Sequence, residues 1–439
     1  MKQGLPPVVF GFVLLGLLPG LLAVVDMSLF GKLTFVHRLQ LWNQPWLWLT
    51  LILLIAFIID FRTSAQRWIF VSKFDFLLIA LILVQALILG QIVSANAATA
   101  NLHLLRILAA LVAGVAGYYA MHHYGTRFLT PLYAAILVGM VLMLPALIYY
   151  LYFVPEARTL GNATRWQLPG LGPVRVFGAG LEAALLIGVS LLVSPIGKGT
   201  SARMALLLAA LALWTMLIWS GARGALLSIL VAALVVSAIR PQNAVRLWLV
   251  LLATATAGAA LSLLIWTPDD ISFGLWNMLD KSSQATVNEI GSRRMERWAD
   301  SIGLIGARPV FGHGLSQFSN LWPTYMTLDQ KNDFAGALPV AFLMYRHLHN
   351  VVLDAFLALG TIGGFAFVWL SVRNVLRALQ RVRNDIDTAR LPALFALIAL
   401  LLHSFLTGIY VFPQTLLLIG LFFGICLAPN PAQNENTNR

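Results

Sequence analysis

Residues 350–371 read NVVLDAFLALGTIGGFAFVWLS, an apolar run that contains one charged side chain, Asp354. A helix needs about 20 apolar residues to cross a hydrocarbon core of about 30 Å. The run lacks the alternation of polar and apolar residues that is typical of strands in a membrane barrel. It therefore predicts a membrane-spanning helix.

The whole chain has the composition of a membrane protein. Of its 439 residues, 59% are hydrophobic and 10% are charged, and the mean hydropathy is +0.83. These proportions leave too few polar residues to cover a soluble globule of this size. We predict an all-α polytopic membrane protein with about twelve spans. They lie at residues 7–25, 44–61, 74–94, 102–120, 128–153, 175–195, 204–220, 223–239, 246–266, 350–371, 391–411 and 413–428.

The positive charges predict the orientation of these spans, because cytoplasmic loops carry an excess of lysine and arginine. With the N-terminus inside, the cytoplasmic loops hold Arg62, Arg67, Lys73, Arg127, Lys198, Arg203, Arg240, Arg246, Arg373, Arg377, Arg381, Arg383 and Arg390. The short outer loops hold Lys32, Arg38, Arg158, Arg165, Arg175 and Arg223. Both termini are therefore predicted to be cytoplasmic. The net charge of +12 mostly reflects this excess and does not indicate nucleic-acid binding.

The chain divides into four parts, namely nine spans in 1–266, an outer loop in 267–349, three spans in 350–429, and a tail in 430–439. An outer loop of this length, placed before the third-last span, is typical of a functional segment. It contains apolar residues at helical spacing, Met295, Trp298, Ile302 and Ile305, and then breaks at Pro309 and Gly312. We expect amphipathic helices that lie over the bundle. The single cysteine, Cys426, excludes an internal disulfide and a cysteine-based metal site.

Four short motifs lie between residues 220 and 365. They are Ser220-Gly-Ala-Arg223-Gly224, Arg294-x-x-x-Trp298, Pro309-Val-Phe-Gly312-His-Gly314, and His349-Asn350 followed by nine residues, Gly360, two residues and Gly363. Each motif is weak alone, but their order and their common side of the membrane resemble the O-antigen ligase and polymerase superfamily of periplasmic glycosyltransferases. The resemblance covers about a third of the chain.

This resemblance implies a GT-C-like enzyme in the inner membrane of a bacterium, with its active site facing the periplasm. The donor would be O-antigen linked to undecaprenyl diphosphate, the acceptor lipid A-core, and no metal or other cofactor would be needed. The length of the chain resembles the ligases more than the longer protein O-oligosaccharyltransferases, whereas the polymerases stay open. A flippase is the alternative from another class, but transporters usually show two similar halves, and this chain is asymmetric.

Three residues are the main candidates for the chemistry. Arg223 begins a span at its outer end, where the helix dipole and the guanidinium both favour a phosphate. Arg294 would supply a second clamp on the diphosphate, with Arg293 in its place if the helix register differs by one residue. A sugar hydroxyl needs a base that works near neutral pH, and His349 fits this role.

Three neighbours of His349 have weaker assignments. His347 would point elsewhere if the two histidines lay on one continuous helix. Asn350 is expected to cap the helix that it opens, and the glycines are expected to allow close packing. Asp354 would either steer the region electrostatically or make a structural hydrogen bond.

Other polar residues carry alternatives that the sequence leaves open. Glu182 and Arg106 lie inside spans, where ionisable groups are costly, and a pair between them is one interpretation. His313 lies between two glycines and is expected to be a turn residue. Asp269-Asp270 fits either a turn after a span or a metal site.

Overall fold

A computed structural model describes residues 5–28, 35–63, 72–153, 167–168, 172–194, 199–266, 294–318, 321, 347–384 and 389–429. Several predictions concern residues outside these ranges. They are Arg293, the pair Asp269-Asp270, most of the outer loop, and the tail at 430–439. The division of the chain into four parts stays a prediction.

The described chain is almost entirely helical. Its helices are α1 (Pro7–Ser28), α2 (Phe35–Thr63), α3 (Lys73–Ile92), α4 (Ala97–Tyr124), α5 (Thr126–Val141), α6 (Met143–Phe153), α8 (Val174–Val193), α9 (Thr200–Trp219), α10 (Arg223–Ile239), α11 (Ala244–Ser262), α14 (Arg294–Ala307), α18 (Val351–Arg383), α19 (Leu391–Leu406) and α20 (Pro413–Leu427). Two short 3-10 helices are η2 (Pro241–Asn243) and η3 (Gly408–Val411). Strands β1 (Gln167–Leu168) and β2 (Gly172–Pro173) form one antiparallel pair.

Every predicted span coincides with an apolar helix or a pair of helices. Among the described residues, eight helical segments are long and apolar enough to cross a membrane, judged by length and composition. Four further apolar helices are shorter, Phe177–Val193, Arg223–Ile239, Leu391–Leu406 and Pro413–Leu427. The chain is therefore a multi-pass membrane protein, and the count of twelve spans stays a prediction.

Two spans differ from their predicted form. The span predicted at 128–153 consists of α5 and α6, which meet at Leu142. The span predicted at 391–411 ends as an α-helix at Leu406, because Thr407 adopts extended backbone angles and the chain continues as η3. This second difference places η3 beside the candidate site.

Glycines allow several helices to approach each other closely. Helix α4 packs along α20, and α1 packs along α5. A Cβ atom at Gly424 would collide with the carbonyl of Gly114, and one at Gly139 would collide with that of Gly16. Small residues at helix contacts let backbones meet, which is the usual way in which membrane helices associate.

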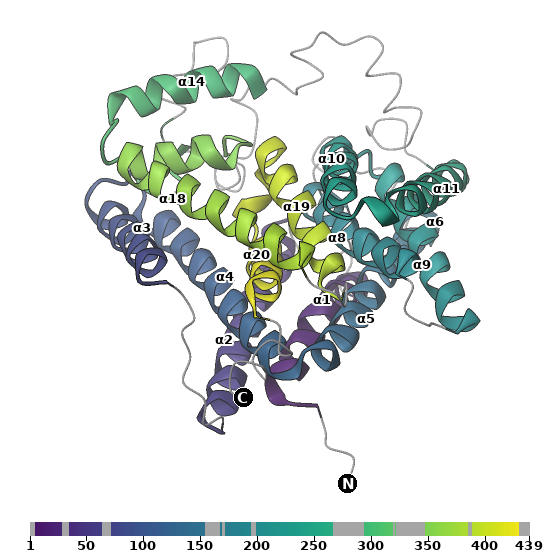
Figure 1. Cartoon of the computed structure of the whole chain (residues 1–439). Helices are drawn as coiled ribbons and strands as arrows, with labels where there is room; N and C mark the ends of the chain where they lie inside the picture. Colours follow the sequence, from purple (N-terminus) through teal and green to yellow (C-terminus); the bar gives the residue numbers. More distant parts are fainter. Residues whose placement is uncertain are drawn as a thin grey trace, which may run out of the picture.

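Helix α14 lies across one end of the bundle, above the first half of α18 (Figure 1). Helices α3 and α4 lie on one side of α18 in this view, and α10 and α11 lie on the other side, beyond α19. Helix α14 therefore packs on α18, whereas the outer loop to which the sequence assigns it stays a prediction. This arrangement brings the four sequence motifs to the same end of the molecule.

Candidate functional site

Helix α18 is interrupted at Gly360, the first motif glycine after His349. Gly360 has φ +62° and ψ −165°, a backbone conformation that is essentially restricted to glycine. A Cβ atom at this position would collide with the carbonyl of Val310. Just after the break, the N–H of Thr361 donates to the carbonyl of Pro309 at 2.7 Å. The helix therefore opens toward the loop that follows α14.

The loop of residues 309–314 fills this opening. The N–H of His313 donates to the carbonyl of Leu357 at 2.8 Å, and that of Gly314 donates to the carbonyl of Ala358 at 2.9 Å. In a continuous helix, these carbonyls would accept from residues four positions further on. The loop supplies the donors that the break has removed, so two motifs that are distant in the sequence form one backbone junction.

The side chain of His313 has a structural role in this junction. Its Nε2 lies 2.8 Å from the carbonyl of Leu304, which accepts the ring proton. Burial lowers the pKa of His313, and the charge of Arg308 acts in the same direction, whereas the Leu304 carbonyl acts against them. His313 is therefore a neutral, buried turn residue near pH 7, and its prediction as a turn residue is confirmed.

His347 and His349 lie side by side just before α18 begins. Their ring centroids are 4.3 Å apart, and both side chains are buried. The expectation that His347 points elsewhere is conditional on a continuous helix, and residues 347–350 lie before α18 begins. His349 instead has a positive φ of 57°, and this left-handed residue turns the backbone so that the two imidazoles lie together.

Asn350 caps α18, as predicted. Its side-chain oxygen accepts from the N–H groups of Val352 and Leu353, at 3.0 and 3.1 Å. Its extended backbone is typical of a residue at this position. The cap determines where α18 begins, and it therefore positions His349, the residue just before the cap.

Helix α14 holds the histidine segment from above through the tryptophan of its motif. The indole N–H of Trp298 donates to the carbonyl of Leu348 at 3.0 Å, between the two histidines. Leu348 is fully buried in a small apolar cluster between α14 and α18. Arg294 precedes Trp298 by four residues and therefore lies on the same side of α14.

The 3-10 helix η3 packs against the imidazole of His347. A Cβ atom at Gly408 would collide with the imidazole of His347. The Tyr410 hydroxyl lies 3.5 Å from the carbonyl of Asn350 and also contacts the Asp354 carboxylate, so it can donate to either. Asp354 is buried, and this contact is the structural hydrogen bond that the sequence left as one of two possibilities for Asp354.

Arg106 and Glu182 do not pair with each other, so that interpretation is wrong. The Arg106 guanidinium donates to the carbonyl of Val411, in η3, at 2.8 Å. Glu182 is fully buried, and its carboxylate contacts Nδ1 of His403 at 3.0 Å and the Ser228 hydroxyl at 2.9 Å. The reason is the packing of α8 against α19, which brings Glu182 to His403.

Arg223 begins α10 after a turn in which Gly221 has a positive φ of 65°. The next residue, Gly224, packs closely on α19 and its end, since a Cβ atom there would lie 2.9 Å from the Thr407 methyl group. Thr407 directly precedes Gly408, which contacts His347. A short chain of contacts therefore connects the Arg223 turn to the two histidines.

Arg294 and Arg223 influence each other electrostatically. Burial, together with the positive charges of Arg297 and Arg223, lowers the pKa of Arg294 to about 10. The guanidinium is still charged at neutral pH. Among the described residues, no carboxylate pairs with Arg294 or Arg223. The two arginines therefore make a region of positive charge that suits an anion.

Residues 403–412 lie near the candidate site, although their sequence predicts only the end of one span and the start of the next. This segment supplies Gly408, Tyr410 and Phe412 to the surroundings of His347, whereas His403 and Thr407 lie against Gly224. One signal is present in the sequence, because Thr407-Gly408 interrupts the apolar run that predicts a span at 391–411. A polar residue followed by glycine inside such a run indicates a break in the helix.

Comparison with known proteins adds one match. The family model described as O-antigen ligase matches residues 207–368. The matched segment contains Arg223, Trp298 and His349, together with the junction at Gly360. No curated protein matches the chain. The match over residues 207–368 supports the assignment to the O-antigen ligase superfamily that the motifs had indicated.

Proposed function

We propose that this protein is an O-antigen ligase, which transfers O-antigen polysaccharide from undecaprenyl diphosphate to a sugar hydroxyl of lipid A-core. The observation that carries the proposal is that Trp298 of α14 bonds the segment of the histidine pair, while Arg294 of the same helix lies within electrostatic range of Arg223. The histidine pair is held between Trp298 and Gly408, so its position is fixed by packing and by a hydrogen bond.

Arg223 and Arg294 bind the diphosphate of the donor in this proposal. The guanidinium groups donate to phosphate oxygens, and the dipole of α10, positive at its first residue, also favours an anion. Their mutual repulsion is relieved when an anion with two or more charges lies between them. The arginines thereby stabilise the diphosphate as the leaving group.

His349 acts as the general base. Its imidazole takes the proton of the acceptor hydroxyl while the oxygen attacks the anomeric carbon from the face opposite the diphosphate. A new carbon–oxygen bond forms as the bond to the diphosphate breaks, and the diphosphate leaves with the electron pair. The configuration of the anomeric carbon is therefore inverted. His347 borders the same space and is the secondary candidate for contact with substrate.

We place the enzyme in the bacterial inner membrane, with both termini cytoplasmic and the site facing the periplasm. The histidine pair precedes the first residue of α18, and the arginine-rich turns lie near its last residue. This separation agrees with the side on which the positive-inside rule puts the arginines.

Two related activities and one unrelated activity are the alternatives. A polymerase of the same superfamily would use the same donor chemistry but join O-antigen to O-antigen, and a protein O-oligosaccharyltransferase would use a protein hydroxyl. A flippase would move the donor without forming a glycosidic bond. Purified protein in proteoliposomes, supplied with the donor and lipid A-core, separates these functions. Ligated lipid A-core, formed without ATP or added divalent metal, supports the ligase. Longer donor chains, or movement of the donor across the membrane without a new glycosidic bond, would contradict it.

Arg223→Ala is expected to weaken donor use by about 10 to 100 fold in kcat/KM, because a charged hydrogen bond contributes about 1.5 to 3 kcal/mol. Arg223→Lys should recover only part of this loss, since an ammonium replaces a fork of donors. Initial rates over a range of donor concentrations measure the effect. Arg203→Ala, at an exposed position in the first turn of α9, is the matched control. Equal kinetics for the two alanine variants would contradict a role in donor binding.

Trp298→Phe is expected to lower transfer about tenfold, because phenylalanine keeps the apolar ring but cannot donate to the Leu348 carbonyl. The free energy of unfolding should fall by about 1 kcal/mol, the usual net contribution of such a bond. Transfer rates and thermal unfolding in detergent are the measurements. Trp369→Phe is the control, since Trp369 is exposed on α18. An unchanged rate in Trp298→Phe would mean that this bond does not position the histidines.

A further inference from the structure

A large cavity lies beneath the histidine segment, between α3, α4, α18 and α20. It has a volume of about 650 Å³. Asp354 and Tyr410 line one end, and Ser72, Arg377 and Arg381 line the other. Most of the wall between these ends is apolar, for example at Ile82, Leu111, Leu370 and Phe423. The cavity therefore has the composition of a site for a hydrocarbon chain with polar groups at both ends.

The cavity extends over most of the thickness of a membrane. The second part of α18 runs from Thr361, just after the break, through Arg381, and at about 1.5 Å per residue it advances about 30 Å. The hydrocarbon core of a bilayer is also about 30 Å thick. Arg381 therefore lies near the headgroup level of the leaflet opposite the histidine pair.

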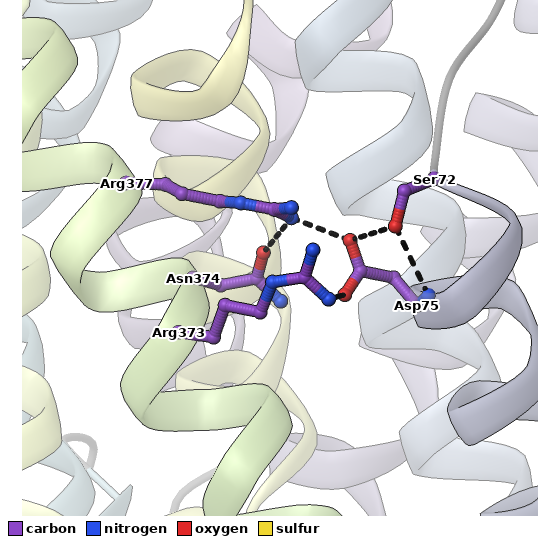
Figure 2. Close-up of polar contacts among 5 residues, drawn as sticks. All are labelled: Ser72, Asp75, Arg373, Asn374 and Arg377. Atoms are coloured by element: carbon purple, nitrogen blue, oxygen red, sulfur yellow. Dashed lines mark hydrogen bonds and ion pairs between the residues drawn. The ribbon is translucent and has the colours of Figure 1, made fainter.

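The arginine end is built around Asp75 of α3 (Figure 2). One carboxylate oxygen accepts from Arg373 at 2.7 Å, and the other accepts from Arg377 and from the Ser72 hydroxyl. Ser72 also caps α3 through the N–H of Asp75. The side chain of Asp75 is only 3% exposed, so this ion pair closes one wall of the cavity.

Among the described residues, positive charge is in excess at this end. Arg373, Arg377 and Arg381 follow one another at intervals of four residues and therefore lie along one side of α18. Asp75 balances one of these three charges. Arg377 and Arg381 both line the cavity, together with the amide of Asn374. The open end of an apolar cavity thus presents donors and positive charge at the depth where lipid phosphates lie.

We propose that this cavity binds an anionic glycerophospholipid of the leaflet opposite the histidine pair. Its phosphate contacts Arg377 and Arg381, and its acyl chains lie between α3, α4 and α18. The position of the arginines distinguishes this ligand from the proposed donor, because a prenyl diphosphate used by His349 would carry its phosphates at the other end. The bound lipid would join α3 to α18 alongside Asp75. The proposal does not depend on the proposed function.

Lipid retention tests the proposal directly. The full chain is equilibrated in nanodiscs with equal amounts of dioleoyl phosphatidylglycerol and dioleoyl phosphatidylcholine, released into detergent, and measured by native mass spectrometry. These lipids share their acyl chains, so a preference reports the headgroup. We expect phosphatidylglycerol to be retained at least about fivefold over phosphatidylcholine, the effect of about one arginine at an anionic headgroup.

Arg381→Gln is the decisive variant, because Arg381 is exposed and lines the cavity. It should lose most of the preference for phosphatidylglycerol. Arg383→Gln is the matched control, since it removes the same charge two residues later, at an exposed position that does not line the cavity. Equal retention of both lipids by the unmodified protein, or equal losses in the two variants, would overturn the proposal.

A second pair of variants tests where the acyl chains lie. Leu370→Trp places a large ring in the cavity wall, whereas Leu376→Trp adds the same ring at a side chain that is 53% exposed on the same helix. Only Leu370→Trp should lower lipid retention. Retention unaffected by Leu370→Trp would place the lipid elsewhere and overturn the proposal. Displacement of phosphatidylglycerol by a tenfold lower amount of undecaprenyl phosphate would also overturn it, because the cavity would then be a prenyl site.

Discussion

Replacement of His349 is expected to reduce glycosyl transfer by about a hundredfold to ten-thousandfold, the usual contribution of a general base. His349→Asn is a sharper test than His349→Ala. Asparagine tolerates the positive φ of 57° at this position better than alanine does, but its amide cannot take a proton. The backbone before α18 should therefore keep its course, and any loss reports the missing imidazole.

Donor binding should survive in both His349 variants, because Arg223 and Arg294 are unchanged. Single-turnover transfer and binding of labelled donor, measured on the same preparation, separate the two steps. His122→Asn is the matched control, since His122 lies in the last turn of α4, about four turns beyond Arg106, the residue of that helix that contacts η3. If His349→Asn keeps more than about a tenth of the rate, His349 is not the base, and His347 becomes the candidate to test.

Much of the helical framework could be predicted because the length of each apolar run largely determines it. A run of about 20 apolar residues has few stable solutions other than a buried or membrane-spanning helix. The ends of helices were harder, because they depend on local backbone angles. The extended Thr407 and the break at Gly360 both lie inside apolar runs, where hydropathy alone gives no boundary.

The sequence proposed residues for the candidate site but not the contacts between their segments. The motifs pointed to His349, Arg223 and Arg294, and their roles stay predictions. The sequence did not indicate that Trp298 would bond the Leu348 carbonyl, or that Gly408 would lie against His347. These contacts join segments that are far apart in the chain, and only the packed structure decides them.

For the ionisable residues inside the spans, the sequence likewise does not identify the partners. A buried Glu182 requires a polar partner, and the structure provides His403 and Ser228. The choice of partner depends on which helix packs beside α8, and the hydropathy of the spans does not predict which helices are neighbours. The pairing with His403 became visible only once α8 and α19 were placed side by side.

Gly360→Ala is expected to have the largest effect of any glycine substitution near the site. Alanine cannot adopt φ +62° with ψ −165° without strain, and its methyl group would collide with the Val310 carbonyl. The loop of residues 309–314 must then move away from α18, and its three backbone hydrogen bonds to the break are lost. We expect a loss of at least about 3 kcal/mol in the free energy of unfolding and almost no transfer.

Gly306→Ala is the matched control for this variant. Gly306 lies in α14, and a Cβ atom there meets no other atom within 4 Å. Alanine also favours a helix more than glycine does, so stability should stay equal or rise slightly. Thermal unfolding and transfer are measured for both variants. In Gly360→Ala, α18 could instead form a continuous helix and the protein could stay folded. A folded but inactive variant would still indicate that the break in α18 positions the histidine segment. Unfolding and transfer that both match those of Gly306→Ala would contradict this role of the break.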